Sequence, residues 1–378
     1  MIVAVVREAS GEARVALVPE TVLRLAKAGI SVLLEHDAGQ NAAFADRLYE
    51  EAGAKIGTDK AALLQDADVL VKVGRPTADE VRALRSGAAV IGFLGPLGDP
   101  AYVQELAKTN ITALSMDAIP RITRAQSMDA LSSQSNIAGY KAVLLAATLL
   151  PKFFPMLTTA AGTIPPAKVL ILGAGVAGLQ AIATARRLGA VVSAYDTRAV
   201  VKEQVQSLGA AFVEFDVGGD AQGAGGYAKE LTPEQIEKQR QFMVQHIGAS
   251  DVVVTTALVP GRRAPVLITE EAVKAMRLGS VIVDLAAEAG GNCEVTKPGQ
   301  TAVVHGVTIV GLRNLPGTMP YHASQLYSRN VFTLLTHLTK DGALNMDFND
   351  EITKGTTLTF GGKILHEPTL AAAAGATA

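Results

Sequence analysis

The sequence is poor in cysteine, in net charge and in long apolar runs, and each of these features is typical of a particular class of protein. Its 378 residues contain a single cysteine, Cys293, which excludes an internal disulfide framework and favours a reducing compartment. The formal net charge of −2 lacks the excess of positive charge that is typical of nucleic-acid-binding proteins. The longest apolar run, Ala142 to Pro151, falls well short of the roughly 20 residues that a membrane-spanning helix needs. The six histidines have no spacing typical of metal ligands, so we predict no metal site.

Length and composition indicate an α/β protein with two domains. A chain of 378 residues is long enough for about two domains, each with its own core. The 36 glycines and the abundant Val, Ile, Leu and Ala suit buried parallel strands joined by tight turns. We therefore predict two Rossmann-like, doubly wound parallel-sheet domains with a cleft between them. Residues 1–128 and 316–378 are predicted to form the first domain, and residues 129–315 the second.

Apolar runs of strand length alternate with helical stretches. In the first domain the predicted strands are Ile2–Val6, Ser31–Glu35, Val69–Val73, Ala89–Phe93 and Thr112–Ser115, and the predicted helices include Pro19–Ala28 and Pro100–Lys108. In the second domain the predicted strands are Lys168–Leu172, Val191–Tyr195, Phe212–Phe215, Val252–Thr256, Val281–Leu285 and Thr308–Leu312. A helix, Ala323–Leu338, and a hairpin around Gly361-Gly362 follow, and the alanine-rich end of the chain is expected to fray.

The stretch from Lys168 to Asp196 has the order strand, glycine turn, helix, strand and acid that is typical of a dinucleotide-binding unit. Its turn, Gly173–Gly178, reads GxGxxG. Gly173 allows the tight turn, Gly175 lets the backbone approach a pyrophosphate, and Gly178 lets the helix pack close to the strand. The helix that follows offers unpaired N–H groups and a positive dipole end to the phosphates.

Asp196 is the predicted determinant of cofactor choice. It lies 23 residues after Gly173, close to the spacing of about 20 that the motif requires. Its carboxylate can accept hydrogen bonds from the adenosine ribose and would repel a 2′-phosphate. The sequence therefore predicts NAD(H) as the nucleotide in preference to NADP(H).

A polar stretch, residues 120–136, separates the two predicted domains and precedes an apolar, helix-like segment, Ile137–Leu150. Polar clusters at a domain junction often line a ligand cleft. The alternative is a solvated linker whose serine and asparagine side chains cap the next helix. Composition alone leaves both interpretations open.

Several segments closely resemble the NAD(H)-binding component, domain I, of proton-translocating nicotinamide nucleotide transhydrogenases. The resemblance covers nearly the whole chain and is carried by Pro120–Asp129, Ser132–Asn136, Ala160–Gly162, Gly173–Gly178, Asp196–Arg198, Lys202–Gln206, Gly226–Lys229, Thr255–Leu258 and Asp284–Cys293. Within that family the chain is similar to the separate alpha-1 subunit of the Si-specific, AB-type enzyme. The resemblance implies a cytoplasmic homodimer that is peripheral on the inner membrane. It would dock on membrane-spanning subunits and exchange hydride with NADP(H) on another component, coupled to proton translocation.

The resemblance also implies roles for individual residues. Gln126 is expected to hold the nicotinamide ring and its ribose at the angle that transfer needs, and Tyr227 to lie on a mobile, glycine-flanked loop that closes over the nucleotide. The implied catalytic residues are Gln126, Arg121, Asp129 and Ser132. The implied NAD(H)-binding residues are Arg121, Ile122, Thr123, Arg124, Gln126, Ser127, Met128, Asp129, Gly173, Ala174, Gly175, Val176, Gly178, Asp196, Thr197, Arg198, Gly226, Tyr227, Ala257 and Leu258.

The chain also resembles, more distantly, the alanine dehydrogenases. Those enzymes have a catalytic histidine where this chain has Phe93, and an essential aspartate where it has Glu288. Oxidation of an amine requires a proton acceptor beside the substrate, and phenylalanine cannot serve. Arg14 and Lys72, which match positions that bind substrate carboxylate in those enzymes, are then interpreted as structural groups. A non-catalytic NAD sensor is a third interpretation, which the motif around Gln126 disfavours.

Overall fold

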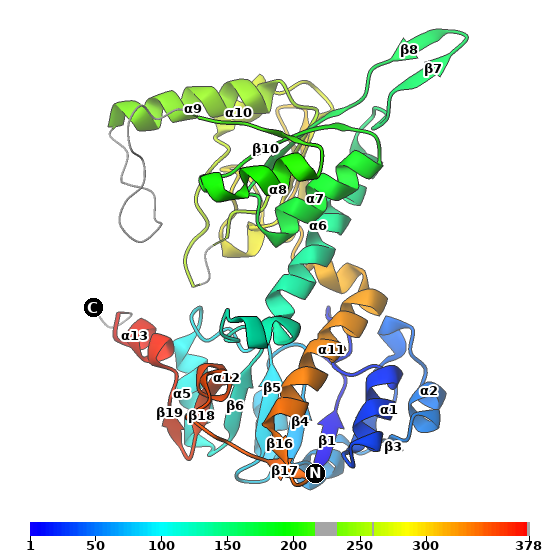
Figure 1. The fold of residues 1–378 in the computed structure, drawn as a ribbon, viewed down its shortest axis with the longest axis vertical. Helices are drawn as coiled ribbons and strands as arrows, with labels where there is room; N and C mark the ends of the chain where they lie inside the picture. Colours follow the sequence, from blue (N-terminus) through cyan, green and yellow to red (C-terminus); the bar gives the residue numbers. More distant parts are fainter. Residues whose placement is uncertain (216–232, 259–260, 376–378) are drawn as a thin grey trace. The chain divides into compact units, whose positions relative to one another are not determined.

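The computed structural model describes residues 1–215, 233–258 and 261–375, which fold as two compact units (Figure 1). The first unit combines Met1–Gln134 with Pro316–Ala378, and the second comprises Ser135–Leu315. Each unit is a parallel-dominated sheet with helices on both faces, so the predicted α/β class is confirmed.

The first unit is built on a sheet with the strand order β19-β18-β6-β5-β4-β1-β2-β3. Its N-terminal elements are β1 (Ile2–Val5), α1 (Pro19–Lys27), β2 (Ser31–Glu35), α2 (Asp46–Glu51), β3 (Lys55–Gly57), α3 (Lys60–Asp66), β4 (Val69–Val71), α4 (Ala78–Ala83), β5 (Ala89–Gly92), α5 (Pro100–Lys108), β6 (Thr112–Ser115) and the 3-10 turn η2 (Thr123–Met128). Its C-terminal elements are α11 (Pro320–Leu338), β16 (Thr339–Lys340), β17 (Ala343–Leu344), α12 (Glu351–Thr356), β18 (Thr357–Phe360), β19 (Lys363–Ile364) and α13 (Glu367–Gly375).

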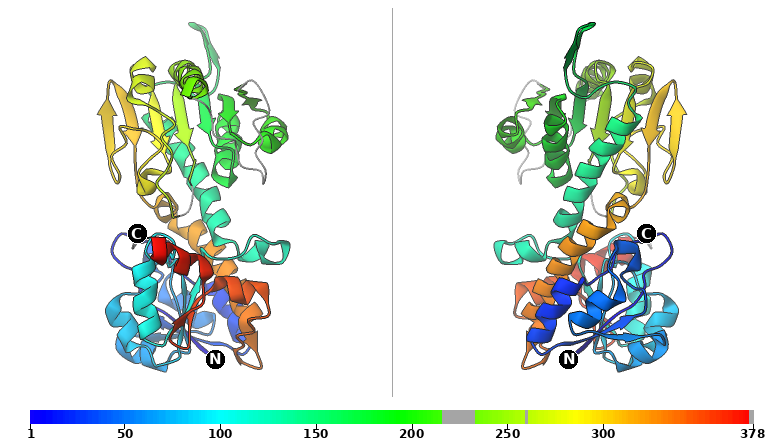
Figure 2. Two further views of the ribbon diagram at one scale, coloured as in Figure 1. Left: turned by 90° about the vertical axis from the view of Figure 1, so that its left-hand side faces the viewer. Right: turned by 90° about the vertical axis from the view of Figure 1, so that its right-hand side faces the viewer.

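Alternate residues of these strands face two separate cores, which is why helices cover both faces (Figure 2). On one face Val3, Val5 and Ile91 pack with α1, α2 and α11. On the other, Ala4 and Val90 pack with α3, α4 and α5. The chain moves from β1 to β2 in one direction and from β4 to β6 in the other, so the strand order reverses between β1 and β4.

The second unit has a sheet with the order β11-β10-β9-β12-β13-β15-β14 among its described residues. Its elements are α6 (Ala130–Leu149, which begins in the first unit), β7 (Leu157–Thr159), β8 (Gly162–Ile164), β9 (Lys168–Leu172), α7 (Val176–Arg187), β10 (Val191–Tyr195), α8 (Lys202–Ser207), β11 (Ala211–Phe212), α9 (Pro233–Gly248), β12 (Val252–Thr255), α10 (Glu270–Ala275), β13 (Val281–Asp284), β14 (Thr301–Val304) and β15 (Val307–Val310). Helices α6, α7 and α8 contribute to the core on one face, and α9 and α10 to the core on the other.

The structure corrects several predicted elements. Helix α6 begins at Ala130 and not at Ile137, because Asp129 accepts hydrogen bonds from the backbone N–H and hydroxyl of Ser132 and so starts the helix early. The predicted strand at Phe212–Phe215 is wrong except at its first residue, because the two-residue strand β11 comprises Ala211–Phe212. The alanine-rich end does not fray through residue 375 but forms α13, which contacts α5.

The helical glycine Gly139 marks a close contact between α6 and α7. A Cβ atom at this position would lie 2.1 Å from the carbonyl oxygen of Ala177. We predict that Gly139→Ala destabilises the protein by about 1–3 kcal/mol, the usual cost of forcing an extra group into a packed core. Gly355→Ala in α12 is the matched control, because its Cβ would lie 3.4 Å from its nearest neighbour, a ring carbon of Pro120. Urea unfolding should show a lower midpoint for Gly139→Ala alone; equal midpoints would contradict the close packing.

Candidate functional site

The glycine turn at the end of β9 has the geometry of an anion-binding helix start. Gly173 has a φ of +100°, and its N–H donates to the carbonyl of Tyr195 at the end of β10. Gly175 is the N-cap of α7 and makes no side-chain cap hydrogen bond. The first amides of this 12-residue helix are therefore not capped by a side chain. Such amides, with the helix dipole, favour a phosphate.

The three glycines of the turn have different physical reasons to be glycine. A Cβ at Gly178 would lie 1.8 Å from the carbonyl oxygen of Gly173, and a Cβ at Gly173 would lie 2.5 Å from the hydroxyl of Thr256. These two positions are required by packing within the chain. A Cβ at Gly175 would meet no atom within 4 Å. The absence of a side chain at Gly175 therefore leaves open space beside the turn, where a phosphate group could lie close to the protein backbone.

Asp196 follows β10 and lies against the same turn. Its Oδ2 accepts a hydrogen bond from the N–H of Ala174 at 2.8 Å, and its two oxygens accept three more from Arg198. Burial alone would raise the pKa of Asp196, but the hydrogen bonds from Arg198 and Ala174 hold it below the ordinary value. The structure thus brings Ala174, Asp196 and Arg198 together, with the exposed Thr197 beside them.

The loop after β12 is tied to the glycine turn. The hydroxyl of Thr256 donates to the carbonyl of Gly173 at 2.9 Å. The residue after Thr256, Ala257, forms two hydrogen bonds with the Asn292 side chain. The Asn292 Oδ1 accepts from the Ala257 N–H at 3.1 Å, and the Asn292 Nδ2 donates to the Ala257 carbonyl at 2.8 Å. Ala257 is held in place by these bonds, while Leu258 is 52% exposed.

Asp284 is a second buried carboxylate at this edge of the sheet. It is fully buried at the end of β13 and accepts hydrogen bonds from the Thr255 and Thr296 hydroxyls and from the N–H groups of Ala286 and Cys293. It therefore fixes the loop that carries Asn292. No role was predicted for Asn292, Thr256 or Asp284 individually, although Asp284, like Asp196, follows a buried strand.

The other predicted residues lie in the first unit, on and around η2. Arg121, Thr123, Arg124, Gln126 and Ser127 are exposed, and Ile122 and Asp129 are half-buried. Met128, by contrast, is only 3% exposed and belongs to the core of the unit. The described residues offer no hydrogen-bond partner to the side chains of Arg121 and Gln126. The predicted residues Gly226 and Tyr227 lie outside the described part of the chain.

Three of these polar side chains have partners within the first unit. Arg124 forms an ion pair with Asp350 at 3.0 Å. Asp129 accepts hydrogen bonds from the backbone N–H of Ser132 at 2.9 Å and from its hydroxyl at 2.5 Å. The structure therefore joins Asp129 and Ser132 at the start of α6.

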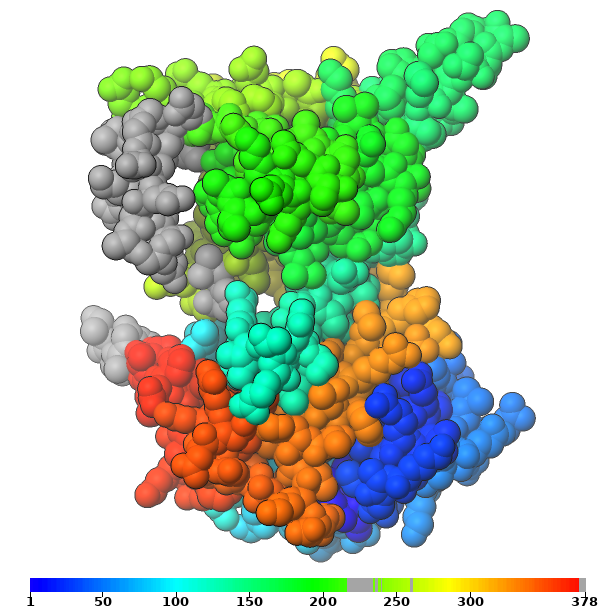
Figure 3. Space-filling view, viewed as in Figure 1, coloured from blue at the N-terminus to red at the C-terminus, as the bar shows by residue number. Residues whose placement is uncertain are grey.

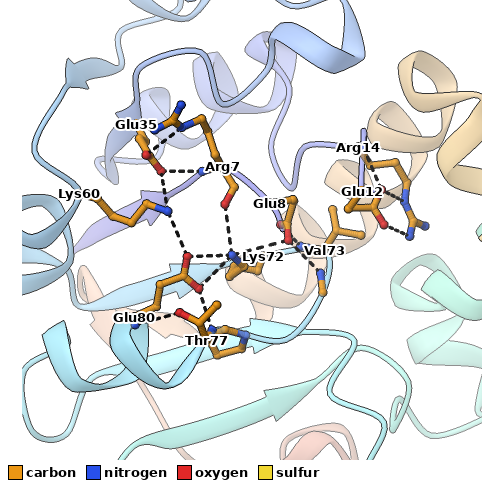
Figure 4. Close-up of polar contacts among 12 residues, drawn as sticks. Arg7, Glu8, Glu12, Arg14, Glu35, Lys60, Lys72, Val73, Thr77 and Glu80 are labelled. Carbon is orange, nitrogen blue, oxygen red and sulfur yellow. Dashed lines mark hydrogen bonds and ion pairs between the residues drawn. The ribbon is translucent and has the colours of Figure 1, made fainter. Parts of the chain in front are cut away.

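Arg14 and Lys72 have partners that the sequence did not reveal (Figure 4). Lys72 is 1% exposed and lies 3.1 Å from both oxygens of Glu80 and 3.7 Å from Glu8. Burial raises the pKa of Glu8, against the opposing effect of the Lys72 ammonium. Arg14 is 8% exposed and pairs with Glu12, while its Nη1 donates to Gln134. Both cations are therefore engaged by groups of the chain, which supports a structural role.

A pocket of about 400 Å³ lies beside this network, at the point where the strand order reverses. Doubly wound sheets commonly bind ligands at that point. The charged residues that line it are paired, however: Arg7 and Lys60 contact Glu35, Lys60 also contacts Glu80, and Glu8 and Glu80 lie near Lys72 (Figure 4). The remaining charged lining residue, Asp79, pairs with Arg82. No residue predicted to bind NAD(H) lines it. We assign it no ligand.

Cys293 and a small cluster around His36 have structural explanations. Cys293 is 1% exposed, and burial raises the pKa of its thiol to about 11, so it is a small core residue and not a nucleophile. His36, Asp37 and Asp46 lie within 4.8 Å of one another, which their sequence spacing did not indicate. His36 and Asp37 are exposed, and His36 forms ion-pair contacts with both aspartates, so we assign no metal there.

Comparisons with known proteins agree with this arrangement. The family model for the N-terminal domain of alanine dehydrogenase/PNT matches residues 4–138, and the model for its C-terminal domain matches residues 142–367. The chain belongs to the alanine dehydrogenase/PNT family.

The similar proteins include both transhydrogenases and alanine dehydrogenases. An NAD(P) transhydrogenase subunit alpha chain of Rhodospirillum rubrum is 49% identical over 365 residues, which cover 94% of this chain and 95% of that protein. The structure of a transhydrogenase from Sinorhizobium meliloti is 44% identical with a TM-score of 0.85, covering 97% of this chain and 99% of that one. An L-alanine dehydrogenase structure has a TM-score of 0.84 at 26% identity and covers 99% of both chains. The predicted resemblance is thus confirmed, with alanine dehydrogenase the more distant.

The two positions at which the chain is expected to differ from alanine dehydrogenases, Phe93 and Glu288, have contacts within the chain. Phe93 packs against Tyr327, with ring centroids 5.2 Å apart, and the Tyr327 hydroxyl donates to the carbonyl of Lys72. Glu288 accepts a hydrogen bond from the backbone N–H of Asn314 at 2.5 Å. Phe93 is therefore a packing residue of the first unit and Glu288 a loop anchor of the second.

Gly175 and Gly178 offer a paired test of the glycine turn. We predict that Gly175→Ala folds normally but weakens NADH binding on the order of tenfold, because its methyl group would enter the space that the pyrophosphate needs. Gly178→Ala should instead lower the thermal midpoint, because its methyl group would strike the Gly173 carbonyl. Calorimetric titration with NADH and thermal unfolding separate the two effects. Unchanged NADH affinity in Gly175→Ala would show that the pyrophosphate does not lie on this turn.

Proposed function

We propose that this chain is the NAD(H)-binding catalytic subunit of a proton-translocating NAD(P)⁺ transhydrogenase of the Si-specific, AB type. Hydride passes directly from NADH on this chain to NADP⁺ on a partner component. Membrane-spanning subunits couple that transfer to proton translocation. The observation that carries the proposal is the complete glycine turn with Asp196 in a chain that lacks a proton acceptor at position 93.

The chemistry of the two candidate reactions favours transfer between nucleotides. Exchange of hydride between two nicotinamide rings removes no proton from a substrate, so it needs no general base. It needs the two C4 atoms at about 3–3.5 Å with aligned orbitals, which is a positioning task. The chain offers groups for positioning: amides and open space at Gly175, and the exposed polar side chains of Arg121 and Gln126.

The proposal assigns roles to the two groups of residues. In the second unit the turn around Gly175 would hold the pyrophosphate, Asp196 the adenosine ribose, and Ala257 with Leu258 the adenosine side. In the first unit Gln126 and Arg121 would contact the nicotinamide end, and the pair Asp129–Ser132 would support them. Apart from Arg198, which pairs with Asp196, the remaining residues expected to bind NAD(H), including Tyr227, keep the roles that the resemblance implies.

The membrane part of the reaction would belong to partner subunits. Among the described residues, no helix combines the length and the apolar character that crossing a bilayer requires. We propose that the chain attaches to the cytoplasmic side of the inner membrane through those partners.

A hydride-transfer assay tests the function directly. The chain is mixed with an NADP-binding component, and transfer from NADH is followed by stopped flow. NADH binding by the chain alone, with transfer only when the component is present, supports the proposal. NAD-dependent oxidation of alanine by the isolated chain would instead establish the alanine dehydrogenase alternative.

Gln126 should matter more for transfer than for binding. We predict that Gln126→Asn lowers the single-turnover transfer rate by up to about a hundredfold, the effect of a misplacement near 1 Å at the reacting carbons. NADH affinity should fall only modestly, because the adenosine and pyrophosphate half carries most of the contact surface. Gln65→Asn, the same change at an exposed position of α3, is the control and should transfer at the wild-type rate. A wild-type rate in Gln126→Asn would remove this residue from the catalytic group.

The homodimer has a candidate contact in the hairpin β7–β8. Its strands pair only with each other among the described residues, and the hairpin projects from the second unit (Figure 3). A lone two-stranded hairpin is marginally stable in water, so it gains from a partner. Ile164, 39% exposed, is its apolar end residue. We predict that Ile164→Asp converts dimer to monomer in light scattering after size exclusion, whereas Val303→Asp on β14 does not. A wild-type mass for both variants would place the contact elsewhere.

A further inference from the structure

The Asp196 carboxylate is fully engaged by donors of its own chain. Oδ1 accepts from the backbone N–H of Arg198 at 2.8 Å and from its Nε at 3.0 Å. Oδ2 accepts from Arg198 Nη2 at 2.9 Å and from the N–H of Ala174 at 2.8 Å. A carboxylate offers about four lone-pair positions. All four are therefore occupied, and a ribose hydroxyl can be accepted only if one of these donors leaves.

The four donors differ in how easily they can leave. Those of Ala174 and of the Arg198 backbone belong to the main chain around the glycine turn. The other two donors are Nε and Nη2 of the Arg198 guanidinium. The Arg198 side chain is 54% exposed, whereas the Asp196 side chain is 6% exposed. The guanidinium edge presents two parallel N–H donors to the carboxylate. A ribose presents two neighbouring hydroxyl donors, so the two groups can occupy the same positions.

From this geometry we infer that Arg198 holds the ribose-binding positions of Asp196 and must be displaced when NADH binds, which makes Arg198 a specificity-determining residue. The inference rests on the proposed NAD(H)-binding function. Because the Arg198 side chain is half-exposed, its guanidinium can move into water and exchange for two hydroxyl donors. The pair therefore opposes binding of any nucleotide slightly and keeps the carboxylate oriented until a ribose arrives.

The same pair bears on the exclusion of NADPH. An arginine near the ribose is the group that accommodates a 2′-phosphate in NADP-binding proteins. Here Asp196 both repels a phosphate and keeps the guanidinium of Arg198 engaged. Removal of the Asp196 charge should then do two things at once: end the repulsion and release a cation that can pair with the phosphate.

The first part of the test removes the Arg198 side chain, which competes with the ribose for Asp196. Arg198→Ala should bind NADH about two- to fivefold more tightly, the range that an exposed ion pair contributes to an equilibrium. Arg187→Ala is the matched control, because Arg187 is exposed in the same unit but lies at the far end of α7, about 16 Å along the helix. NADH fluorescence is a direct readout, since the chain has no tryptophan.

The second arm tests selectivity with a double-mutant cycle. Asp196→Asn keeps an oxygen that can accept from Ala174 and removes the charge. This variant should bind NADPH about tenfold more tightly than wild type, because a charge-assisted bond to the phosphate becomes available. Most of this gain should be lost in the double variant Asp196→Asn with Arg198→Ala, which keeps only the part that comes from the lost repulsion. Thermal unfolding of each variant shows that the turn has remained folded.

The outcomes separate this inference from the proposed function. Tighter NADH binding in Arg198→Ala and an NADPH gain that depends on Arg198 support it. Unchanged or weaker NADH binding in Arg198→Ala overturns it, because Arg198 would then be a bystander or a direct ligand. An NADPH gain that is equally large in the double variant also overturns it, because Arg198 would then contribute nothing to it. Absence of NADH binding by the wild-type chain would overturn the proposed function as well.

Discussion

The close approach of α7 to the end of β9 is the constraint on which the second unit depends. Gly178 lies against the Gly173 carbonyl, and the Thr256 hydroxyl donates to that same oxygen. The N–H of Ala174 in this turn donates to Asp196. One tight turn thus fixes a helix start, the end of β10 and the loop after β12 relative to one another, and it leaves open space only at Gly175. The proposed anion-binding position and the proposed ribose-binding carboxylate would both be consequences of that packing.

Two cations at positions that the resemblance links to substrate binding in alanine dehydrogenases are paired within this chain. Lys72 and Arg14 are buried and held by Glu80, Glu8 and Glu12, so neither cation is available as an open carboxylate receptor. Phe93 lies on Tyr327, where it cannot accept a proton. Under the proposed function no base is needed at this position, because a hydride, and no proton, moves between the two nicotinamide rings. Asp196 and Arg198 also form an ion pair, which on our inference opens when a nucleotide binds.

Much of the fold could be predicted because buried parallel strands are short apolar runs, and β2, β6, β9 and β10 have the predicted bounds. The three-residue strand β3 was missed because its sequence, Lys55-Ile-Gly57, has too little apolar pattern. The start of α6 was misplaced because serines were interpreted as caps when Asp129 has that role. The glycine turn and Asp196 could be named from their spacing. Asn292 and the partners of Lys72 could not, because contacts between separate loops leave no periodic trace in the sequence.

The central claim is that hydride moves directly between two nucleotides without exchange with water. The most direct measurement uses NADH deuterated at the transferred C4 position, incubated with this chain, its NADP-binding partner component and NADP⁺, with mass spectrometry of the products. We expect the NADPH formed to carry the deuterium stoichiometrically in ordinary water. NADPH without the label, or with hydrogen taken from the solvent, would contradict direct transfer.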